Sequence, residues 1–108
     1  MEGYRTITPT ELHDRIELGK KFDLVDVREP IEFEIARIEG ARLLPLSRFQ
    51  EWADSLSREN ETVVICHHGI RSAQVCQFLA RAGFQNLYNL AGGIDRWSRE
   101  VDPEIPVY

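Results

Sequence analysis

Cysteine is scarce in this chain, which contains only Cys66 and Cys76 and has no CxxC pair. A small secreted domain held together by disulfides needs a denser cysteine framework, so we expect a reducing compartment. No stretch approaches the roughly 20 apolar residues that span a bilayer. Charged residues are scattered through residues 1–20 and leave no apolar core for a signal peptide. These absences predict a cytoplasmic protein with no membrane association.

Lysine is also rare, because Lys20 and Lys21 are the only two. The 13 basic residues are outnumbered by 18 acidic ones, which leaves a net charge of −5 and no basic block. A surface that follows nucleic-acid phosphates needs clustered positive charge, so nucleic acid is not an expected partner. The 108 residues are 43% hydrophobic and 29% charged, an ordinary composition for one globular core. Because no linker, repeat or low-complexity segment interrupts them, we predict one domain over residues 1–108.

Short apolar segments alternate with helical patterns along the chain. We predict strands at residues 4–7, 23–27, 41–46, 62–65 and 87–90. Helices are predicted over residues 71–82 and after Gly93, with an extended tail at residues 101–108. A further helix should begin after Thr8, which forms a capping box with Glu11, and others should run from Pro30 to Ala36 and from the N-cap Ser47 to about Leu56. The first helix would bury Leu12, Ile16 and Leu18. This alternation over short connections implies right-handed βα units and a mostly parallel sheet, which is an α/β fold.

Cys66 directly follows the strand predicted at residues 62–65, and a short polar loop then leads into a helix. In parallel sheets the ligand site lies beyond the carboxyl ends of the strands, which is where this cysteine stands. The backbone N–H groups of such a loop converge with the helix N-terminus on one point and favour an anion there. Gly69 permits a tight backbone, and Arg71 adds a permanent positive charge at the rim. The sequence therefore predicts an activated cysteine in an anion-binding loop.

This loop resembles the active site of a known family. Residues 66–72 (CHHGIRS) are similar to the CxxGxR segment, followed by Ser or Thr, of the rhodanese family. Three further segments resemble signatures of that family in the same order: 26–33 (DVREPIEF), 37–41 (RIEGA) and 90–97 (LAGGIDRW). The chain is therefore identified as a member of the rhodanese family over about residues 5–100. One departure is Arg37, where the family commonly has histidine.

The resemblance implies a three-layer domain, in which a parallel five-stranded sheet has helices on both faces. It also implies a sulfurtransferase that moves a sulfane sulfur from thiosulfate or a related anionic donor to cyanide or a thiol, including a protein thiol. Cys66 would be the nucleophile and would carry the sulfur as a persulfide. The loop residues that would hold the substrate are His67, His68, Gly69, Ile70, Arg71 and Ser72. No cofactor and no metal are implied.

Two other functions remain open. Cysteine phosphatases and arsenate reductases also place a thiolate in an anion-binding loop, but their loop is one residue longer than the four residues between Cys66 and Arg71. The smaller loop fits a sulfur atom better than a tetrahedral phosphate. The second alternative is a persulfide relay or protein-binding module with little thiosulfate turnover, because a fold alone does not decide its role.

Other reactive side chains have simpler structural interpretations. Cys76 lies on the apolar stripe of its helix, so we expect it in the core rather than as a resolving thiol. His67 and His68 do not have the usual spacing of zinc ligands, and we expect them to line the entrance to the loop. We expect Asp26, Arg28 and Glu32 to make structural ion pairs near the carboxyl edge of the sheet rather than to contact substrate.

Overall fold

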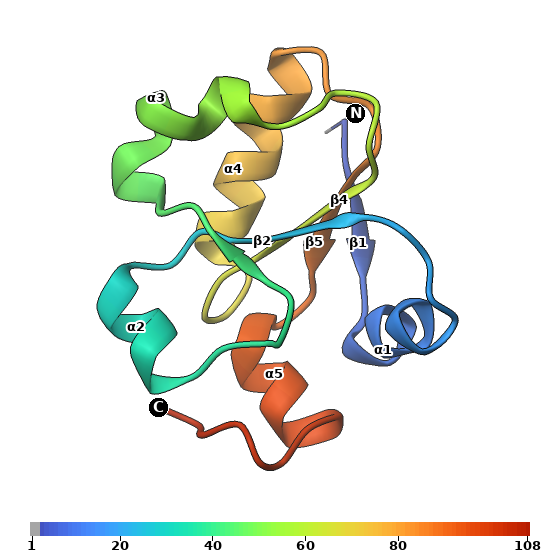
Figure 1. Ribbon diagram of the computed structural model, residues 1–108, viewed down its shortest axis with the longest axis vertical. Helices are drawn as coiled ribbons and strands as arrows, with labels where there is room; N and C mark the ends of the chain where they lie inside the picture. Colours follow the sequence, from blue (N-terminus) through green and yellow to red (C-terminus); the bar gives the residue numbers. More distant parts are fainter. Residues whose placement is uncertain (1–2) are drawn as a thin grey trace.

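Strands and helices alternate along the computed structural model, which describes residues 3–108 (Figure 1). The strands are β1 (Arg5–Ile7), β2 (Asp23–Asp26), β3 (Arg42–Leu43), β4 (Thr62–Ile65) and β5 (Leu87–Leu90). The helices are α1 (Pro9–Glu17), α2 (Pro30–Ile35), α3 (Phe49–Trp52), α4 (Ile70–Arg81) and α5 (Gly93–Glu100), with the 3₁₀ turns η1 (Leu46–Arg48) and η2 (Ala53–Ser55) flanking α3. The strands form one sheet in the order β1-β5-β4-β2-β3, and each neighbouring pair is parallel. The predicted α/β fold with a parallel five-stranded sheet is confirmed.

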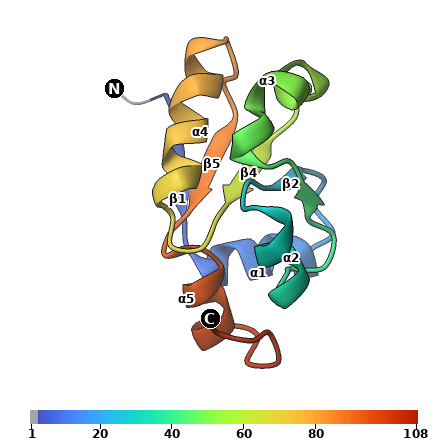
Figure 2. The ribbon, with the colours of Figure 1, turned by 90° about the vertical axis from the view of Figure 1, so that its left-hand side faces the viewer.

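Two hydrophobic cores lie on opposite faces of this sheet. In β4, Val64 belongs to one core, whereas Val63 and Ile65 belong to the other, because successive side chains of a strand point to opposite faces. Residues of α3 and α4 complete the Val64 core, and residues of α1 and α5 complete the second core. Figures 1 and 2 show the two helix pairs on either side of the sheet. Helices therefore cover both faces of the sheet, as the family resemblance implied.

Helix α1 begins as predicted but buries less than predicted. Thr8 caps it in a capping box, since its hydroxyl accepts the N–H of Glu11 and the Glu11 carboxylate accepts the N–H of Thr8. Leu12 is fully buried. The prediction that Ile16 and Leu18 are also buried is wrong, because their exposed fractions are 39% and 73%. Leu12 and Ile16 have the spacing of one helix face, but the second half of this short helix extends past the core into solvent.

The segment between β2 and β4 departs most from the prediction. The strand expected at residues 41–46 contains only Arg42 and Leu43, and Pro45, which has no N–H for a ladder, follows closely. The prediction of Ser47 as a helix cap is wrong, because Ser47 lies inside η1 and its hydroxyl donates to Glu29 at 2.7 Å. The single helix expected up to Leu56 is instead split into η1, α3 and η2.

The C-terminal tail is only partly extended. A turn forms where the N–H of Ile105 donates to the carbonyl of Asp102 at 3.2 Å. This turn directs the chain back towards α2, where the Tyr108 hydroxyl donates to Glu32 at 2.9 Å. The prediction of an extended tail is therefore wrong for its first half, and the reversal brings Tyr108 to the carboxyl edge of the sheet.

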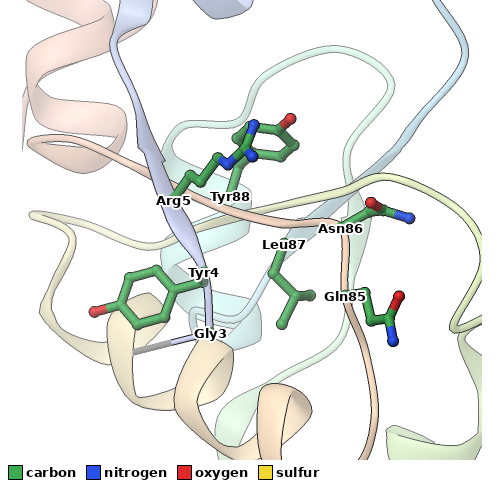
Figure 3. A pocket seen from close by; sticks show the side chains of 7 residues that line it. All are labelled: Gly3, Tyr4, Arg5, Gln85, Asn86, Leu87 and Tyr88. Atoms are coloured by element: carbon green, nitrogen blue, oxygen red, sulfur yellow. The ribbon is translucent and has the colours of Figure 1, made fainter. Parts of the chain in front are cut away.

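A surface pocket lies at the opposite, amino edge of the sheet (Figure 3). Its lining comes from the first residues of β1 and β5 and the segments before them: Gly3, Tyr4, Arg5, Gln85, Asn86, Leu87 and Tyr88. It contains neither a cysteine nor a histidine, so it is separate from the predicted site. Among residues 3–108, no helix combines the length and apolar character that a membrane crossing requires.

Candidate active site

Cys66 lies immediately after β4, at the carboxyl edge where the sequence predicts the site. The residue is 1% exposed. Its Sγ accepts the backbone N–H of Gly69 at 3.1 Å and that of Ser72 at 3.3 Å, and it lies 3.2 Å from the Ser72 hydroxyl oxygen. Two of the loop amides thus point at the sulfur, at the N-terminus of the 12-residue helix α4. Both features stabilise negative charge on this sulfur.

Gly69 provides the tight turn of the loop. Its φ is +96°, in the left-handed region, and it is the N-cap of α4. A Cβ at this position would lie 3.3 Å from the Leu90 carbonyl oxygen and 3.4 Å from the Gly92 nitrogen. A side chain would therefore meet both backbone strain and the turn between β5 and α5.

Helix α5 holds the start of the loop. The N–H of Ile94 donates to the Cys66 carbonyl at 2.9 Å, and the N–H of Asp95 donates to the His67 carbonyl at 3.1 Å. Gly93 allows this approach, because a Cβ there would lie 2.5 Å from the Cys66 carbonyl oxygen. Gly92 and Gly93 therefore allow α5 to support the loop that follows Cys66 through backbone contacts.

Asn89, which is not one of the predicted site residues, completes the surroundings of the sulfur. Asn89, near the end of β5 and 8% exposed, accepts the Ser72 hydroxyl at 2.5 Å. Its Nδ2 donates to the Gly69 carbonyl at 3.0 Å. The sequence did mark Asn89 as unusual, because asparagine is disfavoured in strands and is rarely buried without polar partners.

Arg71 is at the rim of the loop, as predicted, but its charge is paired. Its guanidinium donates to both carboxylate oxygens of Glu32 in α2, at 2.6 and 2.8 Å. These hydrogen bonds lower the pKa of Glu32 to about 2. Glu32 also raises the pKa of Arg71, so both groups remain charged. Glu32 therefore makes an ion pair, as expected, and its partner Arg71 joins α2 to the loop that follows Cys66.

A second, buried ion pair lies beside it. Arg28 is fully buried and donates to Asp26 at 2.6 Å and to the Tyr108 hydroxyl at 2.7 Å. Burial would lower the pKa of Arg28, but the hydrogen bonds and negative charge of Asp26, together with Tyr108, outweigh burial and raise that pKa. The pairing of Asp26 with Arg28 matches the expected structural role, and Tyr108 connects it to Glu32.

His67 and His68 stack on each other, with 3.9 Å between their ring centroids and 28° between their planes. Tyr108 stacks on His67 at 3.9 Å and 5°. Burial and the neighbouring His68 lower the pKa of His67, which favours its neutral form. His68 is exposed and His67 is partly exposed. Tyr108 lies beside these histidines, although it was not among the predicted site residues.

These histidines and Asp95 are the residue types that bind transition metals. Their potential ligand atoms lie within 4.8 Å of one another. Zinc binds in the plane of each imidazole at about 2.0–2.1 Å from the nitrogen. Two nearly parallel rings 3.9 Å apart cannot both point a nitrogen at one ion. Asp95 also accepts a hydrogen bond from Arg99. We therefore assign no metal to this cluster.

Cys76 lies in the hydrophobic core beneath the loop. It is fully buried and a free thiol. Burial raises its pKa to about 12, so it stays protonated and unreactive at neutral pH. The expected position of Cys76 in the core is confirmed.

Comparison with known proteins gives consistent results. The family described as Rhodanese-like domain matches residues 8–100. The thiosulfate sulfurtransferase GlpE of Actinobacillus succinogenes is 33% identical over 106 residues, covering 98% of this chain and 95% of that protein. The probable adenylyltransferase/sulfurtransferase MoeZ of Mycobacterium tuberculosis is 38% identical over 105 residues, covering 95% of this chain but 27% of that protein. This chain therefore spans only about a quarter of that longer relative.

A solved structure is similar over nearly the whole chain. The rhodanese-related protein of Thermoplasma volcanium superposes with a TM-score of 0.83 at 33% identity, covering 97% of this chain and 100% of that one.

Proposed function

The chain belongs to the rhodanese family, and from this premise we propose that it is a sulfurtransferase that carries a sulfane sulfur as a persulfide on Cys66. The observation that carries the proposal is the set of donors at this sulfur, the amides of Gly69 and Ser72 at the N-terminus of α4. Donors fixed by the backbone need no reorganisation when charge develops. They suit both a thiolate and the sulfur chain of a persulfide.

In the first step, the Cys66 thiolate attacks the outer sulfur of a small anionic donor such as thiosulfate. The new bond joins the two sulfur atoms, and the bond between the donor sulfurs breaks. Its electron pair leaves with sulfite, and the persulfide keeps a negative terminal sulfur. Arg71 carries a positive charge at the rim of the loop and interacts electrostatically with Cys66, which supports it as a contact for the anionic donor.

In the second step, a nucleophile such as cyanide or a thiolate attacks the terminal sulfur. The sulfur–sulfur bond breaks, and its electron pair returns to Cys66 as the thiolate. The amides of Gly69 and Ser72 stabilise this leaving group through the contacts they make with the free sulfur. The cycle needs no cofactor, because electrons and atoms balance between donor and acceptor.

A phosphatase function has less support. Four residues separate Cys66 from Arg71, one fewer than in the phosphatase loop. The shorter loop offers fewer backbone amides to the three oxygens of a phosphoryl group, so sulfur transfer fits this loop better.

Transfer to a protein thiol is a second candidate, and exposed apolar residues beside the loop favour it. Ile70 is 72% exposed and Ile31 is 69% exposed. Each is the sequence neighbour of one member of the Arg71–Glu32 pair, so both flank the junction of α2 and α4. Apolar surface at the mouth of an active site is suited to a macromolecular acceptor.

Thiocyanate formation from thiosulfate and cyanide tests the activity. We expect turnover in the wild type and in Cys76→Ala, and a loss of at least about 1000-fold in Cys66→Ser, because the nucleophile is missing. Retained turnover in Cys66→Ser would refute the proposal. If small donors load Cys66 but cyanide is a poor acceptor, faster transfer to a protein thiol would support the relay.

A further inference from the structure

The side chains round Cys66 form a closed circuit of hydrogen bonds. Sγ of Cys66 meets the Ser72 hydroxyl, the Ser72 hydroxyl meets Asn89, Asn89 meets the Gly69 carbonyl, and the Gly69 N–H returns to Sγ. Ser72 and Asn89 are buried, and Cys66 is 1% exposed. Direct hydrogen bonds within the circuit therefore decide which atom holds each proton.

The carbonyl oxygen of Gly69 determines which group donates and which accepts in each hydrogen bond of the circuit. The Gly69 carbonyl can only accept, so the Asn89 atom at 3.0 Å from it must be the Nδ2 donor. The other end of the amide is then Oδ1, which can only accept, so Ser72 must donate to it at 2.5 Å. A hydroxyl has one hydrogen, and here Asn89 takes it.

The same reasoning shows which atom donates between Cys66 and Ser72. With its hydrogen on Asn89, the Ser72 oxygen turns lone pairs towards Sγ at 3.2 Å. A neutral Cys66 thiol donates its S–H to those lone pairs. A thiolate has no proton to give, so it gains a bond from Ser72 only if the hydroxyl leaves Asn89. That rotation would leave Asn89 Oδ1 buried without its donor, which is costly.

We propose that Asn89 is a positioning residue that binds the Ser72 hydroxyl, disfavours the Cys66 thiolate and so sets the pH range in which Cys66 reacts. This proposal rests on the proposed function of Cys66 as the nucleophile. The backbone amides of Gly69 and Ser72 attract negative charge to the sulfur, and Asn89 opposes part of that attraction. The backbone amides and Asn89 therefore act on the charge of the sulfur in opposite directions.

A substitution of Asn89 leaves the charged groups near Cys66 in place. Arg71 and Cys76, both on α4, are ionisable groups that interact electrostatically with Cys66. Other charged or titratable groups near the loop are His67, His68, Asp26, Arg28, Glu32, Asp95 and Tyr108. A substitution of Asn89 removes none of these groups, so a shift in the titration of Cys66 reports on the hydrogen-bond circuit.

The test is a double-mutant cycle over Asn89→Leu and Ser72→Ala, read by the ultraviolet absorbance of the thiolate as pH is raised. Cys66→Ser provides the baseline. Asn89→Leu keeps a similar volume and releases the Ser72 hydroxyl to the sulfur. We expect the midpoint of the Cys66 titration to fall by about one pH unit, which is about tenfold more thiolate below the midpoint. In the Ser72→Ala background the same substitution should shift the midpoint by less than about 0.3 units.

Equal shifts in both backgrounds, or no downward shift in the single variant, would overturn the proposal, because Asn89 would then act only by supporting Gly69. If Asn89→Leu does not fold, as judged by circular dichroism, Asn89→Ala replaces it in the same cycle. The titration uses no sulfur donor. The titration therefore tests the role of Asn89 even if Cys66 does not accept sulfur. A Cys66 that titrates as expected but accepts no sulfur would count against the proposed function and not against the role of Asn89.

Discussion

Arg71 and Glu32 are joined by two parallel hydrogen bonds, from Nη1 to Oε1 at 2.6 Å and from Nη2 to Oε2 at 2.8 Å. The residues are 39 positions apart, and the pair connects the start of α4 to α2. The exposed fractions of the two side chains are 35% and 17%, so solvent screens the pair in part. Its bidentate geometry nevertheless fixes the orientation of the guanidinium at the rim of the Cys66 loop.

The first prediction concerns stability at low pH. The pKa of Glu32 falls from 4.5 to about 2 on folding, so its contribution is complete above pH 4.5 and is lost as pH falls towards 2. We expect the free energy of unfolding in urea to decline through this window in the wild type. Glu32→Gln should be less stable at pH 7 by about 1 kcal/mol, a value discounted for exposure. Its decline below pH 4.5 should also be shallower. Parallel curves for the two proteins would contradict this assignment.

The second prediction separates backbone strain from the shape of the loop. Gly69 and Gly40 have φ values of +96° and +88°, but a Cβ would meet backbone atoms at Gly69 and nothing within 4 Å at Gly40. Alanine at either position should destabilise the protein by about 1–2 kcal/mol in urea unfolding. Gly69→Ala should also lower the rate of sulfur transfer by about tenfold or more, because it displaces an amide from the sulfur. An equal loss of activity in Gly40→Ala would show that lower global stability, and not displacement of the Gly69 amide, reduces the rate of sulfur transfer.

The third prediction concerns donor binding. Two N–H groups of Arg71 bind Glu32, which leaves other guanidinium donors for an anion. We expect Arg71→Ala to raise the KM for thiosulfate by about tenfold with a smaller change in kcat. The matched control is Arg81→Ala, an exposed arginine at the other end of the same helix. Similar KM values in all three proteins would remove Arg71 from the donor site.

The parts of the fold that depend on local sequence could be predicted. The bounds of β4 and β5 match the predicted strands, and Thr8 and Glu11 form the predicted capping box. Cys66 could be placed because a buried strand followed by a glycine-containing loop leaves few alternatives for its position. These features are encoded within a few consecutive residues.

Features that depend on distant contacts could not be predicted from one sequence. Asn89 reaches Ser72 across 17 positions, and its importance depends on the strand order of the sheet. Tyr108 reaches Glu32 across 76 positions because of a turn in a tail that prolines were expected to keep extended. Ile16 has the spacing of a buried residue but is exposed, since helix length alone does not show where the core ends.

The most direct test of the account is the intact mass of the protein after incubation with thiosulfate and removal of excess donor. Cys66→Ser and Cys76→Ala serve as paired controls. We predict a gain of about 32 Da, one sulfur atom, in the wild type and in Cys76→Ala, reversed by cyanide, and no gain in Cys66→Ser. An unchanged mass of folded wild-type protein, or the same gain in Cys66→Ser, would contradict a persulfide on Cys66.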